Sequence, residues 1–367
     1  MKIALFIATF AGGGAESVFA TLAKEFNARG HNVDLIIGDT SNAVYLHLIP
    51  DQVRVINLKA RQIRRCLPAL IDYLRKNEPD VVLATRAHSC CFAILAKIFS
   101  GVKTAVILRE ASTISSNLRK YPWKKRLLLG FFVRFLYPLA DVIIGVSHGV
   151  KNDLKEFLKE SDQKLYVVYS PIITEDLFVN ASQPCNHVWF QHGGAPVILG
   201  VGRLAYEKRF DVLIKAFAIV RKFKDIRLLI LGEGEERLQL ESLVAILKLQ
   251  KDISLPGYEP NPFKYMSRAR LFVMSSDWEG LPGALIQALA CGCSVISTDC
   301  QSGPREILKN GRMGKLVPVG DINAMALAIG EALTHEPIQI DRNDLHEYTA
   351  KSSVDNYLRL FDIVRKT

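Results

Sequence analysis

The residues with the clearest chemical potential lie in SDWEGLPGALIQALACG, residues 276–292. An apolar, strand-like run ends just before Glu279, a Gly-Leu-Pro turn follows, and Gln287 comes later in a helix-like segment. A carboxylate and an amide oxygen about 12 Å apart along a helix can accept hydrogen bonds from hydroxyls at two ends of one ligand. The alternative is structural, because a helix dipole favours an acid in the first turn and Gln287 can be an exposed polar position.

Two cations follow an earlier apolar run. Arg203 comes directly after VILGVG, and Lys208 lies five residues further on, near the start of a predicted helix. An arginine fork and a lysine point charge suit a diphosphate. The alternative is a pair of solvated surface cations, one of which pairs with Glu207.

Two glycine-containing turns are further candidates for anion binding. Gly13 and Gly14 belong to a GGG run between a strand-like and a helix-like segment, where free backbone N–H groups can meet an anion. The run lacks the dinucleotide spacing G-x-G-x-x-G, because Ser17 lies three positions after Gly14. TDCQSGPREIL, residues 298–308, has a similar Gly-Pro helix start. A tight structural turn explains the GGG run equally well, and a structural turn is the alternative for residues 298–308.

The elements that position these residues alternate between strand and helix. Apolar runs of strand length are separated by amphipathic segments, such as those predicted to be helical at 15–29, 61–77, 209–224 and 281–291. The alternation stops at 170–196 and then restarts, which predicts two parallel α/β sheets in tandem. Such sheets bind ligands beyond the carboxyl ends of their strands, where the candidate residues lie.

Composition excludes several classes of protein. The chain has 367 residues, of which 49% are apolar and 23% charged, which is typical of a globular protein with two domains. Its seven cysteines form no C-x-x-C pair and fit reduced thiols, not a zinc site. No run is long and apolar enough for a transmembrane helix. The N-terminal apolar run is interpreted as a first strand and not as a signal peptide, so we expect a cytoplasmic protein.

Positive charge gathers in the N-terminal half. The net charge is +10, and residues 1–180 carry 24 Lys and Arg against 16 Asp and Glu. Such a surface attracts anionic lipid, nucleic acid or phosphorylated substrates. Segment 117–140 places a cluster of cations beside aromatic residues, which suits an interfacial membrane contact. A helix packed on the core with a solvated basic end is the alternative.

These motifs together resemble a known family. VGRLAYEKRFDVLIKAF, LLILGEGEE, ISLPGYEPNPFKYM and the segment from 276 to 308 resemble the retaining, nucleotide-sugar-dependent glycosyltransferases of family 4. The resemblance implies an α/β fold of the GT-B type, with two Rossmann-like domains facing each other across a cleft. It predicts an N-terminal acceptor-binding domain, a linker, a C-terminal nucleotide-sugar-binding domain and a helix that crosses back, at residues 1–175, 176–196, 197–345 and 346–367 respectively.

The resemblance also implies roles for individual residues. Arg203 and Lys208 would neutralise the donor diphosphate, and Glu279 would bind donor sugar hydroxyls. These three are the predicted catalytic residues. Backbone contacts to the donor sugar, phosphate or base, together with the ribose position, are implied for Gly13, Gly14, Gly257, Tyr258, Gly280, Leu281, Pro282 and Gln287.

Two positions depart from the family pattern. The family has Glu, seven residues, then Glu, whereas here the second position is Gln287, which can still accept a hydroxyl hydrogen bond but without a charge. Some relatives have a histidine where this chain has Ala111, so no catalytic histidine is carried over. Arg109 and Glu110 follow a strand and are interpreted as cleft residues. His148 is interpreted either in the same way or as a helix-start residue without chemistry.

The resemblance predicts a hexosyltransferase, and the lack of an Asp-x-Asp metal motif leads us to expect no essential metal or cofactor. Its donor would be a nucleotide diphosphate sugar, preferably UDP-linked with GDP next, carrying a hexose or an N-acetylhexosamine. Its acceptor would be a lipid-linked glycan, polysaccharide or lipopolysaccharide at the cytoplasmic membrane face, with an anionic membrane surface as a further partner and no nucleic acid. The alternatives are a nucleotide-sugar 2-epimerase of the same fold and, outside enzymes, a basic nucleic-acid-binding protein.

Overall fold

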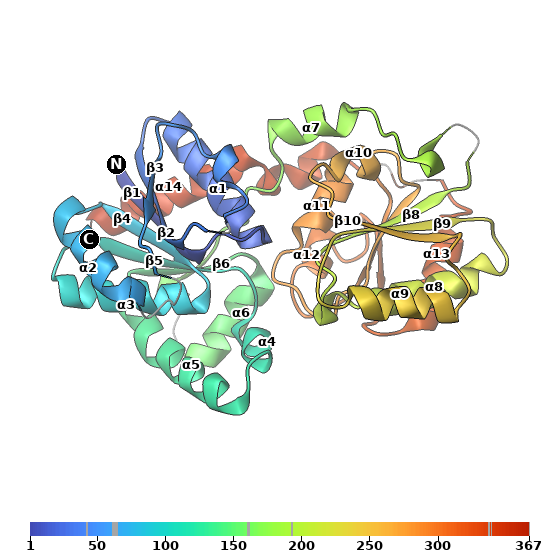
Figure 1. The fold of residues 1–367 in the computed structure, drawn as a ribbon. Helices are drawn as coiled ribbons and strands as arrows, with labels where there is room; N and C mark the ends of the chain where they lie inside the picture. The colour runs from blue at the N-terminus through green and yellow to red at the C-terminus, as the bar shows by residue number, and fades with distance from the viewer. Residues whose placement is uncertain are drawn as a thin grey trace. The chain divides into compact units, whose positions relative to one another are not determined.

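The chain folds into two compact units (Figure 1). The computed structural model describes residues 1–41, 43–60, 65–159, 162–191, 194–336, 338 and 340–366. Unit 1 consists of Met1–Pro171 together with Glu347–Thr367, and unit 2 consists of Ile172–His346. Each unit has its own parallel sheet flanked by helices. The expected α/β fold with two tandem sheets is therefore confirmed.

Unit 1 is built on a seven-stranded sheet with the order β3-β2-β1-β4-β5-β6-β7. The chain moves outward from β1 to β3 and then returns to β4 beside β1, so the topological switch point lies between β1 and β4. Its strands are β1 (Lys2–Thr9), β2 (Asn32–Asp39), β3 (Arg54–Asn57), β4 (Val81–Thr85), β5 (Ala105–Glu110), β6 (Val142–Gly145) and β7 (Leu165–Val167). Its helices are α1 (Gly14–Ala28), α2 (Cys66–Asn77), α3 (Ala87–Ser100), α4 (Ile114–Arg119), α5 (Trp123–Leu136), α6 (His148–Leu158) and α14 (Ala350–Lys366).

Unit 2 repeats the plan with six strands in the order β10-β9-β8-β11-β12-β13. Its switch point lies between β8 and β11. The strands are β8 (Val197–Val201), β9 (Arg227–Leu231), β10 (Ile253–Gly257), β11 (Leu271–Met274), β12 (Val295–Thr298) and β13 (Lys315–Val317). The helices are α7 (Glu175–Ser182), α8 (Phe210–Arg221), α9 (Arg237–Ile246), α10 (Phe263–Met266), α11 (Gly283–Ala290), α12 (Pro304–Ile307) and α13 (Ile322–Ala332).

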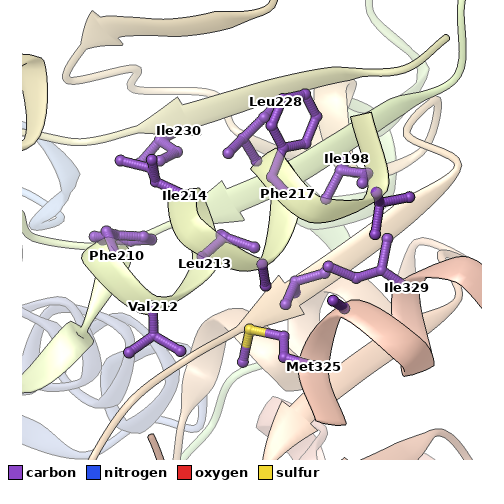
Figure 2. Close-up of a cluster of buried hydrophobic side chains, with 14 of the residues drawn as sticks. Ile198, Phe210, Val212, Leu213, Ile214, Phe217, Leu228, Ile230, Met325 and Ile329 are labelled. Carbon is purple, nitrogen blue, oxygen red and sulfur yellow. The ribbon is translucent and has the colours of Figure 1, made fainter. Parts of the chain in front are cut away.

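The core of unit 2 shows why the sequence folds in this way. Phe210 and Phe217 of α8 pack with Ile230 of β9, and Met325 of α13 belongs to the same buried cluster (Figure 2). Strands such as β11 are buried along their whole length, as expected for a sheet covered by helices on both faces. Ile198 of β8 belongs to the same cluster, so this packing fixes the position of β8 and of the loop that follows it.

Two predicted segments differ in part from what the structure describes. The predicted helix at 61–77 begins within residues 61–64, which lie outside the described residues, and α2 begins at Cys66. Residues 176–196, predicted to be a linker, contain most of α7. That helix is bound to unit 2, since Asn261 Nδ2 donates to Asn180 O at 2.9 Å and Ser267 Oγ donates to Ala181 O at 2.9 Å.

The C-terminal helix α14 belongs to unit 1. Tyr357 and Phe361 pack against Phe26 of α1, with ring centroids 6.3 and 5.5 Å away. Ser353 Oγ donates to Tyr169 O at 2.6 Å. The hydrophobic core of unit 1 is therefore completed by the last helix of the chain.

This packing corrects the interpretation of Arg109 and Glu110 as cleft residues. Both are 1% exposed. Arg109 donates to the hydroxyls of Tyr357 at 3.0 Å and Ser170 at 2.7 Å, so it joins β5 to α14. The hydroxyl of Tyr137 donates to Glu110 Oε1. Both side chains therefore make their contacts in the interior of unit 1.

Glu110 leads to a prediction about pH. Burial raises its pKa to about 7, against an ordinary value of 4.5, so the folded chain holds a proton that the unfolded chain has already lost. We expect the contribution of Glu110 to the free energy of unfolding to be fully present below the ordinary value and to fall by up to roughly 3 kcal/mol as the pH rises through about 7. Glu110→Gln should remove this slope in denaturant titrations at several pH values. Glu156→Gln, at an exposed position of α6, should leave the slope intact.

A second prediction concerns Gly232, which has a φ of +147°. A Cβ added there would lie 1.9 Å from the carbonyl oxygen of Gly202, a backbone atom that cannot move aside. We expect Gly232→Ala to lower the free energy of unfolding by at least about 3 kcal/mol. Gly330→Ala is the control, because an added Cβ would meet nothing within 4 Å in α13 and should stabilise the helix by roughly 0.5–1 kcal/mol. Equal denaturation midpoints for the two variants would contradict this account.

Candidate functional site

The predicted catalytic residues of unit 2 lie at its topological switch point. Strands β8 and β11 are neighbours, with Leu271 paired to Ile198. Arg203 and Lys208 follow β8, and Glu279 follows β11. From these two neighbouring strands the chain continues toward opposite edges of the sheet, which leaves room at their carboxyl ends. Open α/β sheets bind ligands at such a place.

The structure brings Lys208 and Glu279 into contact although they are 71 residues apart. Lys208 Nζ lies 2.6 Å from Glu279 Oε1, and the side chains are 27% and 12% exposed. Ser276 Oγ donates to the same carboxylate oxygen at 2.7 Å. Within the described ranges Glu279 Oε2 has no hydrogen-bond donor of its own. The pair therefore offers a fixed ammonium group and a carboxylate oxygen that accepts hydroxyl hydrogen bonds.

Arg209 stabilises the loops that carry Lys208 and Glu279. Its φ of +47° is rare for a residue with a side chain, and two ion pairs hold it there. Nη1 lies 3.0 Å from Asp277 Oδ1, and Nε lies 3.0 Å from Asp211 Oδ1. The hydrogen bond with Asp211, and then that with Asp277, raise the pKa of Arg209. Arg209 adjoins Lys208 in the loop after β8, and Asp277 lies just before Glu279 in the loop after β11. The ion pair between Arg209 and Asp277 therefore joins these two loops.

Arg203 has other partners. Its guanidinium lies 3.3 Å from Glu207 Oε1 and 3.7 Å from Glu235 Oε1, and its side chain is 59% exposed. The pairing with Glu207 that the sequence left open is thus present. Exposed ion pairs of this kind contribute little free energy, so an anionic ligand can displace these carboxylates at small cost.

The Gly280-Leu281-Pro282 turn connects Glu279 to α11. The helix begins at Gly283, later than predicted, because Pro282 is its N-cap and holds Leu281 out of helical geometry. Glu279 and Gln287 are therefore not two residues of one helical face, which corrects the spacing argument. Gln287 is half-buried in α11.

The Ser-Gly-Pro stretch after β12 supports that turn. Ser302 Oγ donates to Gly280 O at 2.8 Å. Gly303 has a φ of +95°, and a Cβ there would lie 2.4 Å from Pro282 Cδ. Glycine is required at 303 for this close approach, so the Ser-Gly-Pro stretch supports the turn that follows Glu279.

The remaining predicted residues lie at loop positions of both sheets. Gly257, with a φ of +103°, ends β10, and its carbonyl accepts from Gly232 N at 2.8 Å. Tyr258 follows and is 59% exposed. In unit 1, Gly13 is the N-cap of α1 and Gly14 is its first residue. Across the described ranges, no group of three or more His, Cys, Asp or Glu side chains is arranged to hold a metal ion.

Sequence reasoning missed several polar residues at the switch points. Ser276 and Asp277 lie two and three residues after β11, and Arg209 adjoins Lys208 in the loop after β8, so a search for every polar residue in the loops that follow the strands would have found them. The same search would have found Arg86, which follows β4 and pairs with Glu16 at 2.5 Å. The contacts of Arg86 with Glu16 and of Arg209 with Asp277 join residues that are 70 and 68 positions apart, so the sequence alone did not show them.

Comparisons with known proteins decide the family. Residues 12–176 match the family model described as Glycosyltransferase Family 4, and residues 188–352 match the model described as Glycosyl transferases group 1. The chain is a family 4-type GT-B glycosyltransferase. The predicted family, fold and enzyme class are confirmed.

Individual relatives of this glycosyltransferase cover nearly its whole length. It is 29% identical over 340 residues to a Campylobacter jejuni enzyme named N-acetylgalactosamine-N,N'-diacetylbacillosaminyl-diphospho-undecaprenol 4-alpha-N-acetylgalactosaminyltransferase, covering 88% of each chain. It is 23% identical to the lipopolysaccharide 1,6-galactosyltransferase of Escherichia coli, covering 92% of this chain and 90% of that one. In fold it matches Anabaena HepE, solved with UDP and glucose, with a TM-score of 0.81, 15% identity and 99% of each chain covered.

Proposed function

We propose that this glycosyltransferase moves a hexose or N-acetylhexosamine from a UDP-linked donor to a lipid-linked glycan, polysaccharide or lipopolysaccharide acceptor, with retention of configuration. The observation that carries the proposal is the contact of Lys208 Nζ with Glu279 Oε1 at 2.6 Å, at the switch point of unit 2. A cation for the departing diphosphate and a carboxylate for the sugar hydroxyls are thereby fixed side by side.

In this mechanism the leaving group carries the developing charge. Lys208, with Arg203 released from Glu207 and Glu235, stabilises the diphosphate as the bond to the sugar breaks. Glu279 accepts hydrogen bonds from the sugar and holds its anomeric carbon toward the acceptor. Displacement on the front face needs no protein nucleophile, because the acceptor hydroxyl oxygen itself bonds to the anomeric carbon as the bond to the diphosphate breaks. The departing diphosphate takes the hydroxyl proton.

The relatives support the choice of donor and acceptor. HepE was solved with UDP and glucose, and the Campylobacter jejuni and Escherichia coli relatives are named for diphospho-undecaprenol and lipopolysaccharide substrates. We infer from these names a UDP-sugar donor and an acceptor of the same kinds. Gln287 takes the ribose through its amide oxygen, and Gly257 and Tyr258 lie near the base.

The surface of α5 supports a peripheral position at the cytoplasmic face of the membrane. Trp123, Leu127, Phe131 and Phe135 recur every four residues and are 67%, 65%, 57% and 57% exposed. Lys124 lies over the Trp123 ring at 5.5 Å, in a helix turn that also contains Lys125 and Arg126. An apolar stripe beside cations suits the interface of an anionic bilayer. In the described part of the chain, no helix combines the length and apolarity needed to cross a bilayer.

The donor proposal is tested by thermal shift with the full chain. A ligand that binds only the folded state raises the melting temperature, by an amount set by its concentration relative to its Kd. We expect UDP and UDP-hexoses to raise it more than the GDP and ADP equivalents. Equal shifts for all the nucleotides, or none, would exclude the donor proposed here.

The reaction type is tested by proton NMR of the product. The anomeric coupling of the transferred sugar should match that of the donor, which shows retention. An inverted product would overturn the mechanism. A sugar epimerised at C2 in the absence of acceptor would assign the chain to the 2-epimerases instead.

A further inference from the structure

The switch point of unit 1 contains its own pair of charged residues. Strands β1 and β4 are neighbours, with Phe6 paired to Ala84. Glu16 lies in the first turn of α1 after β1, and Arg86 follows β4 as the N-cap of α3. Arg86 Nη2 lies 2.5 Å from Glu16 Oε1. Both units thus place one cation and one carboxylate, from two different strand ends, where open α/β sheets bind ligands.

A comparison within the same sheet shows that the Arg86–Glu16 pair is unusual. Arg54 and Asp34 form a similar pair between an exposed arginine and a buried acid, with bonds of 2.8 and 2.6 Å to the two carboxylate oxygens. The hydroxyl of Tyr73 donates to Asp34 as well, so both oxygens of Asp34 are satisfied. Glu16 is equally buried, yet its Oε2 has no partner among the described residues. Burying an oxygen in this way is unfavourable, so structural stability alone does not explain the pair.

The backbone conformation of Arg86 also indicates a role beyond structural stability. Its φ of +72° with a ψ of 134° lies in a region that residues with side chains rarely adopt. Such conformations persist only where the surroundings hold them, and they cluster at ligand sites. Here Thr9 Oγ1, 2.9 Å from Arg86 Nη1, and Glu16 hold the guanidinium. The Arg86 side chain stays 44% exposed, so its remaining N–H groups are free to donate to a ligand.

The surroundings of this guanidinium favour an anion. Helices α1 and α3, of 15 and 14 residues, both begin here without a side-chain cap, so their first N–H groups add positive potential. His88, the second residue of α3, packs against Tyr121 with ring centroids 5.7 Å apart.

We propose that Arg86 anchors a phosphate-binding site at the switch point of unit 1, which takes the phosphate or diphosphate of a phosphorylated acceptor. Glu16 is its positioning residue, since it holds one edge of the guanidinium while the other donates to phosphate oxygens. The site rests on the proposed function for its ligand class, because a lipid-linked acceptor of the kind named for the Campylobacter jejuni relative carries a diphosphate.

Calorimetry with inorganic pyrophosphate tests the site. The full chain is first saturated with UDP, so that the donor site is occupied, and pyrophosphate is then titrated. We expect binding that weakens with salt, and a loss of at least about tenfold in affinity for Arg86→Gln. Arg54→Gln, which removes the matched arginine of the same sheet, should bind pyrophosphate like the wild type. Glu16→Gln should weaken binding several-fold while UDP affinity stays unchanged.

The outcomes separate this inference from the proposed function. No UDP binding would refute the donor proposal, and pyrophosphate titrated alone would then test Arg86 directly. Normal UDP binding with no pyrophosphate binding, or equal pyrophosphate affinity in Arg86→Gln, overturns the site. A loss of UDP affinity in Arg86→Gln also overturns it, because the arginine would then serve the donor. If melting curves show that Arg86→Gln is unfolded, Arg86→Lys carries the test, since it keeps the charge but loses the fork.

Vesicles distinguish a lipid from a soluble acceptor. Phosphatidylcholine vesicles with a polyprenyl phosphate should retain more wild-type chain than pure phosphatidylcholine vesicles, and Arg86→Gln should abolish the difference. Pyrophosphate binding without this difference assigns the same site to a soluble phosphorylated acceptor.

Discussion

Lys208→Ala is expected to lower kcat for sugar transfer by about 10²–10³-fold. The ammonium group lies 2.6 Å from Glu279 and is only 27% exposed, so its charge acts in a partly dehydrated loop cluster. Removing it withdraws the stabilisation of the departing diphosphate and leaves Glu279 with Ser276 as its remaining hydrogen-bond donor. Arg203→Ala should also cost orders of magnitude, because the second cation of the diphosphate site is lost.

Steady-state kinetics with a UDP-sugar measures this loss. Lys315→Ala is the control, since it removes an equally charged residue that pairs with Glu331 at the surface of the same unit, and its kcat should stay at the wild-type value. Glu279→Gln keeps an acceptor for sugar hydroxyls but leaves Lys208 without its carboxylate, so it should lower kcat less than Lys208→Ala. Near-wild-type turnover in Lys208→Ala would remove the proposed mechanism.

The fold could be predicted because its signals are local. Strands such as β8 and β11 are short apolar runs, and α8 shows the apolar spacing of a helix packed on a sheet. Polar residues just after such runs were then easy to find. That reasoning identified Lys208 and Glu279, which the structure brings together, without knowledge of any side-chain distance.

The errors came from contacts between residues distant in the sequence. Arg109 follows a strand, as a site residue does, yet its partner Tyr357 is 248 residues away on α14, and burial by that helix sets its role. Arg86 went unnoticed because its significance lies in a pair with Glu16, 70 residues away, and in a backbone angle. Hydrophobic periodicity reports which face of an element is buried, but it does not report which partner covers that face.

Arg203 and Lys208 also differ in the residues with which they form ion pairs. Both cations follow β8, and the sequence treated them as equivalent. In the structure Lys208 meets the loop after β11, whereas Arg203 meets Glu235 in the loop after β9. The difference depends on loop geometry, which residue types alone do not specify. The two cations should therefore differ in how readily a ligand displaces their partners, and the better buried Lys208 pair should be the harder to break.

Removing the cations of α5 is expected to weaken binding to anionic vesicles by about 10³-fold, since each Lys or Arg near the surface contributes about 1 kcal/mol. The variant carries four changes: Lys120→Gln, Lys124→Gln, Lys125→Gln and Arg126→Gln. All four residues are exposed, at the start of α5 or just before it, so the fold should be unaffected. Flotation with phosphatidylglycerol vesicles at low ionic strength gives the bound fraction.

A matched variant separates this local effect from net charge. Lys222→Gln, Lys224→Gln, Lys248→Gln and Lys251→Gln remove the same charge from unit 2 and should leave flotation nearly unchanged. Equal losses in the two variants would show that net charge alone drives adsorption and that α5 is no docking surface.

The apolar stripe gives an independent test, because Trp123→Ala and Phe131→Ala change no charge. Each side chain is more than half exposed, so truncation should cost the fold little and reduce vesicle binding by about tenfold or more through lost apolar burial. If these two variants float like the wild type, the helix approaches the lipid only electrostatically and does not insert its aromatic face.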